Sequence, residues 1–234
     1  MCIIAIKPKG KQMFADETIR VMYANNPDGA GYMFYDKEHK KVCIKKGFLQ
    51  VEDLIKSLHS RDFTHTNVVM HFRIGTSGLN DKLNCHPFPI YQKNKLKCFT
   101  NLGMAHNGIL RDYEPPKDSL INDTQMFIQC VLSQLGKGFQ NDANCMALLE
   151  ELIGTNKLAF LDNKNHLHLV GNFVEDDGYI FSNSSYKQPR VKKMPRGTTP
   201  TNVSTSRFKL SDSEINFWHD EPNDFWDDWD RRHK

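Results

Sequence analysis

The sequence lacks the features that would indicate export, a membrane or nucleic acid. No run of 18 uncharged apolar residues occurs, and the N-terminus MCIIAIKPKG has neither a basic start nor a small-residue cleavage pattern. With 31 basic and 28 acidic residues, the net charge of +3 is too even to favour nucleic acid or a membrane as a partner. We therefore expect a soluble, cytoplasmic protein with neither of these partners.

Cysteines are few and widely scattered. The six have no CxxC pair and no dense framework, which argues for reduced thiols rather than disulfides: Cys2, Cys43, Cys85, Cys98, Cys130 and Cys145. Cys43 falls in a strand-like run, whereas Cys130 and Cys145 fall in apolar helical patterns and are predicted to fill the core. Cys2 has no such simple explanation.

Several segments have the apolar pattern of strands. Residues 2–6 form a short β-branched run, and residues 67–74 are nearly continuous in apolar side chains, which is typical of a strand covered on both faces. Residues 31–35 and 41–48 read as paired strands. The run 102–108 predicts another strand, which ends in His-Asn-Gly.

Helical spacing alternates irregularly with these strands. Asp16 is predicted to cap a first helix, and residues 51–59 return to helical spacing. Asn122 and Gln125 resemble a capping box before an amphipathic helix that ends near Gly136. Since no regular βαβ alternation or internal repeat occurs, we predict an α+β fold of layered sheets with helices outside.

The composition changes near residue 186. Residues 1–185 have the content of one domain, while residues 186–234 begin as a basic segment rich in Pro, Ser and Thr. All three tryptophans follow among eight acidic residues: Trp218, Trp226 and Trp229. This tail is expected either to pack on its own domain or to dock on a partner.

Cys2 follows the initiator methionine directly, a position with a specific chemical meaning. Removal of Met1 would leave a thiol and a free α-amine on one residue. The α-amine, with an ordinary pKa of about 7.7 to 8.0, can accept the thiol proton near neutral pH. Cys2 is therefore a candidate nucleophile that needs no separate base.

The chain offers partners for such a nucleophile. Asn107 and Gly108 can supply a side-chain amide and a backbone N–H to an oxyanion. Arg73 can clamp a carboxylate with two hydrogen bonds, and Asp123 can pair with an ammonium group. Each also has a structural explanation: a turn for His-Asn-Gly, an ion pair for Arg73 and a first-turn helix charge for Asp123.

Three histidines and a cysteine raise the alternative of a metal site. His71, His86, His106 and Cys85 are suitable zinc ligands, but their spacing fits no short ligand motif. We therefore expect no metal or other cofactor, and we expect His86 to bond to loop backbone.

Five motifs together resemble the class II glutamine amidotransferases in order and spacing: MCIIA at the start, HFRIGTSG at 71–78, NCHP at 84–87, HNG at 106–108 and NDTQ at 122–125. The resemblance covers about residues 2–182. It implies the Ntn-hydrolase fold, a four-layer αββα sandwich, and hydrolysis of L-glutamine to glutamate and ammonia. Gln125 departs from the acidic residue that is frequent in this family, and Cys85 from the usual alanine.

The resemblance also implies a role for each site residue. Cys2 would attack the side-chain amide, and Asn107 with Gly108 would stabilise the oxyanion. Arg73 and Thr76 would bind the α-carboxylate, Asp123 with the Gly108 region would bind the α-amine, and His86 would belong to the substrate-binding set.

An amidotransferase domain normally supplies ammonia to a synthase. After residue 185 the sequence has no phosphate-binding glycine loop or other nucleotide signature, so we expect a separate synthase to accept the ammonia. Two alternatives stay open: a stand-alone Ntn amidohydrolase that acts on another amide, and a non-catalytic binding module with this fold.

Overall fold

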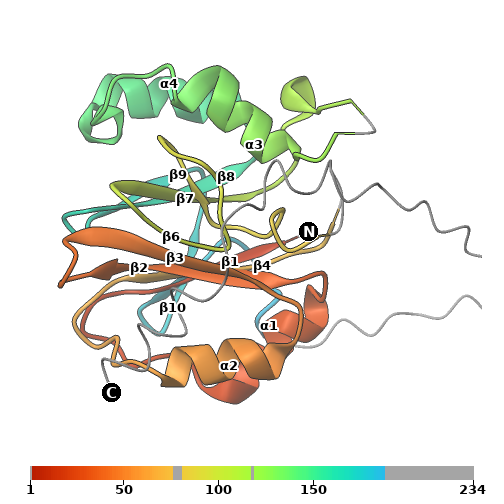
Figure 1. Cartoon of the computed structure of the whole chain (residues 1–234), viewed down its shortest axis with the longest axis vertical. Helices are drawn as coiled ribbons and strands as arrows, with labels where there is room; N and C mark the ends of the chain where they lie inside the picture. Colours follow the sequence, from red (N-terminus) through yellow and green to blue (C-terminus); the bar gives the residue numbers. More distant parts are fainter. Residues whose placement is uncertain (1, 76–80, 117–118, 188–234) are drawn as a thin grey trace, which may run out of the picture. The chain divides into compact units, whose positions relative to one another are not determined.

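The protein is described by a computed structural model, shown in Figure 1, that covers residues 2–75, 81–116 and 119–187. Thr76 and almost all of the predicted tail lie outside the described residues. No helix in these segments is long and apolar enough to cross a membrane. The mixture of helices with antiparallel sheets confirms the predicted α+β class.

The larger sheet has seven strands in the order β10-β11-β1-β4-β2-β3-β6. In chain order these are β1 (Ile3–Lys7), β2 (Ala30–Asp36), β3 (Lys41–Phe48), β4 (Val68–Phe72), β6 (Lys97–Thr100), β10 (Val174–Asp176) and β11 (Tyr179–Phe181). The smaller sheet has the order β5-β7-β8-β9, formed by β5 (Phe88–Pro89), β7 (Leu102–Asn107), β8 (Lys157–Asp162) and β9 (Leu167–Val170).

Strand β1 is an internal strand of the larger sheet. It pairs antiparallel with β4, where Ile4 lies opposite His71, and with β11, where Ala5 lies opposite Phe181. All five of its residues are buried. The β-branched run at the N-terminus therefore forms the predicted strand, and neighbours on both sides hold the backbone that follows Cys2.

Helices α1 (Asp16–Asn25) and α2 (Val51–His59) cover one face of the larger sheet. Ile19 and Met22 of α1 and Leu54 of α2 pack in one core cluster with Ile3 of β1. The boundaries of α2 match the prediction, but Asp16 is not a cap as predicted. Asp16 is the first residue of α1, and Ala15 at the N-cap makes no side-chain cap bond.

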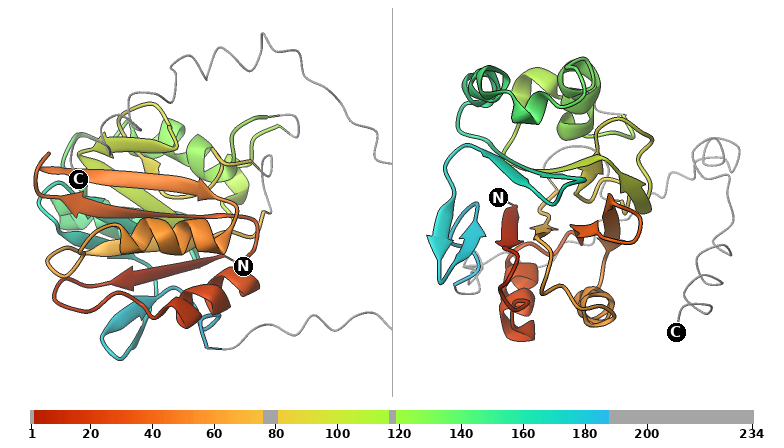
Figure 2. Two further views of the ribbon diagram at one scale, coloured as in Figure 1. Left: turned by 60° about the horizontal axis from the view of Figure 1, so that its bottom comes forward. Right: turned by 90° about the vertical axis from the view of Figure 1, so that its left-hand side faces the viewer.

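The opposite face of the larger sheet packs on the smaller sheet, as Figure 1 and the right-hand view of Figure 2 show. Ile4 and Val69 from the larger sheet share an apolar cluster with Ala105 and Leu161 from the smaller one. Residues at alternate positions of β1 and β7 therefore project into the space between the sheets.

The outer face of the smaller sheet is covered by α3 (Asp123–Phe127), the π-helical segment η2 (Ile128–Leu132) and α4 (Ala143–Ile153). The capping box of Asn122 and Gln125 is present as predicted. The amphipathic helix that begins there forms as predicted, but its bonding changes from α-helical to π-helical after Phe127, and it ends at Leu132, before the predicted Gly136.

The predicted core position of Cys130 is also wrong. In η2 the buried residues are Ile128 and Leu132, whereas Cys130 is exposed. Ile128 and Leu132 pack in the core cluster next to the smaller sheet, whereas Gln129 and Cys130 lie on the exposed side of the segment. Two 3₁₀ turns, η1 (Arg111–Tyr113) and η3 (Phe139–Asn141), complete the helical elements of the described chain.

Candidate active site

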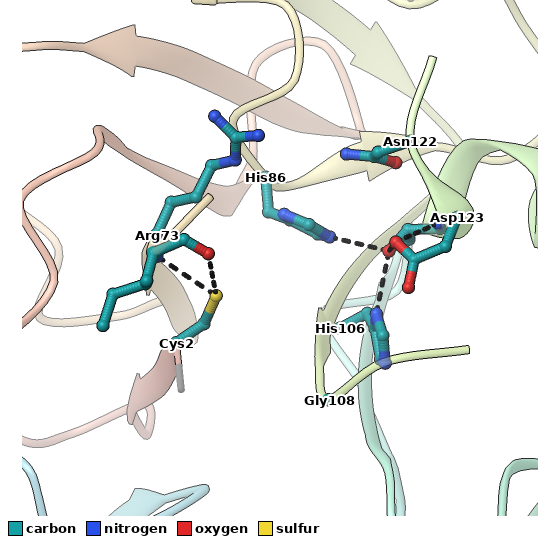
Figure 3. Close-up of a pocket in the computed structure, with 9 residues that line it drawn as sticks. Cys2, Arg73, His86, His106, Gly108, Asn122 and Asp123 are labelled. Atoms are coloured by element: carbon teal, nitrogen blue, oxygen red, sulfur yellow. Dashed lines mark hydrogen bonds between the residues drawn. The ribbon is translucent and has the colours of Figure 1, made fainter. Parts of the chain in front are cut away.

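A cavity open to solvent lies where the start of β1 and the ends of β4 and β7 meet the start of α3. Its lining comes from segments far apart in the sequence: Cys2, Arg73, Ile74, His86, His106, Gly108, Asn122, Asp123 and Thr124. Figure 3 shows Cys2 and Arg73 on one side of this space and His106 and Asp123 on the other. The cavity thus contains most of the site residues predicted from sequence.

The thiol of Cys2 is held by the backbone that follows β4. The N–H of Ile74 donates to Sγ at 3.3 Å, and Sγ lies 3.5 Å from the carbonyl oxygen of the same residue. Burial raises the pKa of the Cys2 thiol, whereas the Ile74 N–H, the N-terminal charge and Arg73 oppose that rise. The sulfur therefore has a defined position in the cavity.

Arg73 is buried, with 3% of its surface exposed. Its backbone pairs with the 28–29 turn, since the Arg73 N–H donates to Gly29 O at 2.8 Å and Asp28 N–H donates to Arg73 O at 3.0 Å. The Asp28 carboxylate accepts the N–H of Gly75 at 2.8 Å. The segment after β4 is thereby tied to the turn that precedes β2.

Thr124 connects two histidines of the cavity. Its Oγ1 lies 2.8 Å from Nδ1 of His106 and 3.2 Å from Nε2 of His86. On the far side of the ring, Nε2 of His106 lies 3.0 Å from Oδ1 of Asn156, whose Nδ2 donates to the carbonyl of Ile153. His86 therefore bonds to a side-chain hydroxyl, and the expected contact with loop backbone is not made through Nε2.

The partners of His106 determine where its proton lies. Because Oδ1 of Asn156 can only accept, Nε2 of His106 carries the hydrogen and Nδ1 is the acceptor. Thr124 then donates its hydroxyl hydrogen to His106 and accepts from Nε2–H of His86. Burial lowers the pKa of both histidines, which agrees with two neutral rings in this chain of hydrogen bonds.

Asp123 is the first residue of α3 and is 6% exposed. Its Oδ2 accepts the N–H of Leu110 at 2.8 Å, and its Oδ1 accepts the N–H of Thr124 at the same distance. These bonds position the carboxylate at the cavity wall, opposite Cys2 (Figure 3). A negative charge in the first turn is also favoured by the helix dipole.

Gly108 lines the cavity, whereas Asn107 does not. Gly108 has a φ of +147°, and a side chain there would overlap the Asn156 carboxamide, so both its backbone and its surroundings require glycine. The Asn107 side chain donates from Nδ2 to Oγ of Ser182 at 2.7 Å, and its buried Oδ1 has no partner among the described residues.

Alternation along the strands nevertheless places Asn107 and Cys2 on facing sides of the two sheets. Asn107 lies two residues after Ala105 in β7, so these two side chains point to the same face of the smaller sheet. Cys2 lies two residues before Ile4 of β1, so these two point to the same face of the larger sheet. Ala105 and Ile4 belong to the cluster between the sheets. The two side chains therefore project toward the same space.

The proposed metal ligands do form a group, with ring centroids 4.2 Å apart for His71 and His86 and 6.2 Å apart for His86 and His106. However, the structure pairs His86 and His106 with Thr124. Within the described residues, the side chains that bring three ligand atoms together are elsewhere: Asp36, Glu38 and His39. Both carboxylate oxygens of Asp36 already have partners there, His39 at Oδ1 and Arg61 at Oδ2.

Sequence reasoning did not single out four of the residues that organise the site: Asp28, Thr124, Asn156 and Ser182. Thr124 lies inside the NDTQ motif, which is the one signal that pointed to it. Asn156 and Ser182 act through partners 50 and 75 residues away, and no local pattern marks them.

Comparison with models of known protein families identifies the family of this chain. The model of the class II glutamine amidotransferases matches residues 15–155, which is more than half of the chain. The match includes Arg73, His86, Gly108 and Asp123 but begins after Cys2. No curated protein matches closely enough to count as a relative. The chain belongs to the class II glutamine amidotransferases.

Proposed function

We propose that this protein releases ammonia from L-glutamine with Cys2 as the nucleophile. The observation that carries the proposal is that the Cys2 thiol shares one cavity with Arg73, Gly108 and Asp123. These three residues match the recognition groups that a free amino acid requires, namely a cation, a backbone donor and an anion. Family membership supports glutamine as the substrate.

The chemistry needs the α-amine that removal of Met1 would release. This amine takes the proton from the thiol, and the thiolate attacks the side-chain amide carbon of glutamine. As the tetrahedral intermediate collapses, the C–N bond breaks and the proton passes to the leaving nitrogen, which departs as ammonia. Water then hydrolyses the thioester to give glutamate and the free thiol.

Each remaining residue has a proposed role in this reaction. The Arg73 guanidinium binds the α-carboxylate, and Thr76 assists it. Asp123 binds the α-ammonium, and the Thr124-linked His86 keeps that wall of the cavity in place. Gly108 N–H and the Asn107 carboxamide stabilise the oxyanion.

The layers support the same assignment. Helices α1 and α2, the two sheets, and helices α3 and α4 follow one another in space (Figure 2), so we infer the αββα sandwich of the Ntn hydrolases. In this arrangement β1 delivers its first residues to the open end of the space between the sheets. We also propose that residues 1–185 form the catalytic domain and residues 186–234 a separate segment, and that the protein acts in the cytoplasm.

The charged groups of the cavity favour a free amino acid over a bulky acyl amide. Arg73 and Asp123 both line it, and they match the α-carboxylate and the α-ammonium that glutamine has and an acyl amide lacks. We therefore expect glutamine to be preferred over acyl amides with long chains, which a panel of amide substrates assayed for ammonia release would test.

Mass spectrometry with 6-diazo-5-oxo-norleucine, a glutamine-like electrophile, tests the nucleophile. We expect loss of Met1 and one adduct on Cys2, blocked by excess glutamine and absent from Cys2→Ala. Cys130→Ala is the matched control, because Cys130 is exposed and away from the cavity. Retained Met1 together with an unlabelled Cys2 would contradict the proposal and favour a binding module.

The ammonia acceptor is proposed to be a separate synthase, and the tail containing Trp218, Trp226 and Trp229 is the proposed dock. Purification of the tagged full chain and of a chain lacking residues 207–234 should recover the synthase with the first only. Equal recovery with both would exclude the tail as the dock.

A further inference from the structure

The segment after β11 connects the two halves of the site. Ser182 is fully buried, and it forms a reciprocal backbone and side-chain contact with β1. The N–H of Ile4 donates to Ser182 Oγ at 2.8 Å, and the N–H of Ser182 donates to Ile4 O at 2.9 Å. The next residue, Asn183, donates from Nδ2 to the carbonyl oxygen of Cys2 at 2.7 Å. Residues 182–183 thus bond to β1 and to Cys2, the residue that precedes this strand.

The same serine contacts the smaller sheet. The Nδ2 atom of Asn107 lies 2.7 Å from Ser182 Oγ. Lys157 of the neighbouring strand donates to the Ser182 carbonyl oxygen. One hydroxyl therefore lies between the backbone of Ile4 and the carboxamide of Asn107. This segment follows the stretch that the family model matches, so family membership assigns it no role.

The polar atoms around this hydroxyl are incompletely paired. Ser182 Oγ accepts from both Ile4 and Asn107, and no described residue accepts its own hydrogen. Asn107 Oδ1 is buried without a partner in the described chain.

Reversal of the Asn107 carboxamide, with the same heavy-atom positions, gives a partner to the Ser182 hydrogen and to Oδ1 and leaves the NH₂ group as the buried group without one. Ser182 then donates its hydroxyl hydrogen to Oδ1, and it still accepts from Ile4. The NH₂ group takes the place of the orphaned oxygen, on the face of β7 that Cys2 also faces.

We propose that Ser182 is a positioning residue, which turns the Asn107 carboxamide so that its NH₂ group points into the space beside Cys2. This inference rests on the proposed function for its catalytic meaning, because the NH₂ group is then the side-chain donor of the oxyanion site. Asn183 supports the arrangement by holding the carbonyl of Cys2.

The test compares Ser182→Ala with Ser184→Ala, a neighbouring serine that is exposed. A donor that acts only in the transition state affects kcat rather than KM. We expect Ser182→Ala to lower kcat for glutamine by at least about tenfold with little change in KM, since loss of one oxyanion donor costs roughly 100- to 1,000-fold. Alkylation of Cys2 by iodoacetamide, which forms no oxyanion, should keep its rate in both variants.

NMR of the Asn107 side-chain amide in the ¹⁵N-labelled full chain gives a second readout. Its resonances should differ from the wild type in Ser182→Ala and match it in Ser184→Ala. In the 6-diazo-5-oxo-norleucine adduct, the amide protons should move downfield in the wild type and not in Ser182→Ala. Should Ser182→Ala fail to fold in a thermal unfolding scan, Ser182→Cys, similar in size and a weaker donor, takes its place.

The two proposals fail in different ways. A wild type without glutaminase activity or adduct contradicts the proposed function, and the Asn107 resonances of the unmodified variants then decide the role of Ser182. Unchanged resonances, or a wild-type kcat in Ser182→Ala, would overturn the positioning role even in an active enzyme.

Discussion

The α-carbon of Gly31 lies against the carbonyl oxygen of His86, and a methyl group at Gly31 would overlap that oxygen. The same methyl group would lie 2.5 Å from Cβ of Lys46. Strand β2 thus supports the loop that brings His86 to the cavity, and the absence of a side chain at one position makes that support possible.

Gly31→Ala is therefore expected to destabilise the protein and to displace His86. An added methyl group would meet the His86 backbone and Lys46 of strand β3, and neither can move without cost. We therefore expect a loss of at least about 2 kcal/mol in the free energy of unfolding. Denaturant unfolding measures the loss. Gly136→Ala is the control, since nothing lies within 4 Å of an added methyl group there. Equal stability of the two variants would contradict the close contact.

Arg73→Lys tests the carboxylate-binding role of Arg73. Lysine keeps the charge but loses the planar pair of donors, so we expect KM for glutamine to rise roughly tenfold or more, with kcat changed much less. Steady-state measurement of ammonia release gives both constants. Arg20→Lys serves as control, because Arg20 pairs with Glu52 on the surface. A fall in kcat at unchanged KM would instead place Arg73 in the chemical step.

The buried histidines predict an acid-sensitive fold. Burial lowers the pKa of His71 from the usual 6.5 to about 3, and it lowers the pKa of His86 well below its usual value. As pH falls from 6.5 toward 3, the unfolded chain binds more protons than the native one. The free energy of unfolding then decreases, by up to about 1.4 kcal/mol per pH unit for each such histidine.

His71→Leu should weaken the dependence of the free energy of unfolding on pH by the contribution of one buried histidine. Urea unfolding at intervals between pH 7 and pH 4 measures it, and His65→Gln is the control at an exposed position. If the slope is the same in His71→Leu and the wild type, His71 is not held neutral by its surroundings.

The remaining cysteines should differ sharply in reactivity. Burial raises the pKa of Cys43 to about 12 and also raises that of Cys85, whereas Cys130 is exposed. We expect iodoacetamide at pH 7.5 to modify Cys130 in the native protein long before Cys43 or Cys85, as peptide mass spectrometry would record. All three should react at similar rates in denaturant. Early labelling of Cys85 in the native protein would show that the loop near His86 opens.

The parts of the fold that sequence predicts well are those with strong periodicity. The continuous apolar run of β4 lies between two neighbours in the sheet, and α2 begins and ends where its spacing indicates. The short strands β5 and β6 were not predicted, because two to four residues contain no measurable period. The π-helical turn after Phe127 was missed since its apolar pattern differs little from that of an α-helix.

For the site, sequence motifs identify the residues that would contact a substrate, and the structure brings Cys2, Arg73 and Asp123 to one cavity. The supporting residues follow from pairings that only the folded chain creates. Asn156 bonds to His106, and Ser182 bonds to Asn107, over separations of 50 and 75 residues. No local spacing in the sequence therefore identifies Asn156 or Ser182 as a supporting residue.

The pairing of β1 with β11 has a consequence for the time at which the site forms. Ala5 meets Phe181 in this pair, so β1 has one neighbour until the ribosome has released almost all of the described chain. At ~5–20 residues per second, this takes roughly ten seconds or more. During that interval the backbone around Cys2 lacks the bonds from Ser182 and Asn183, so the proposed removal of Met1 would act on a segment that the sheet has not yet enclosed.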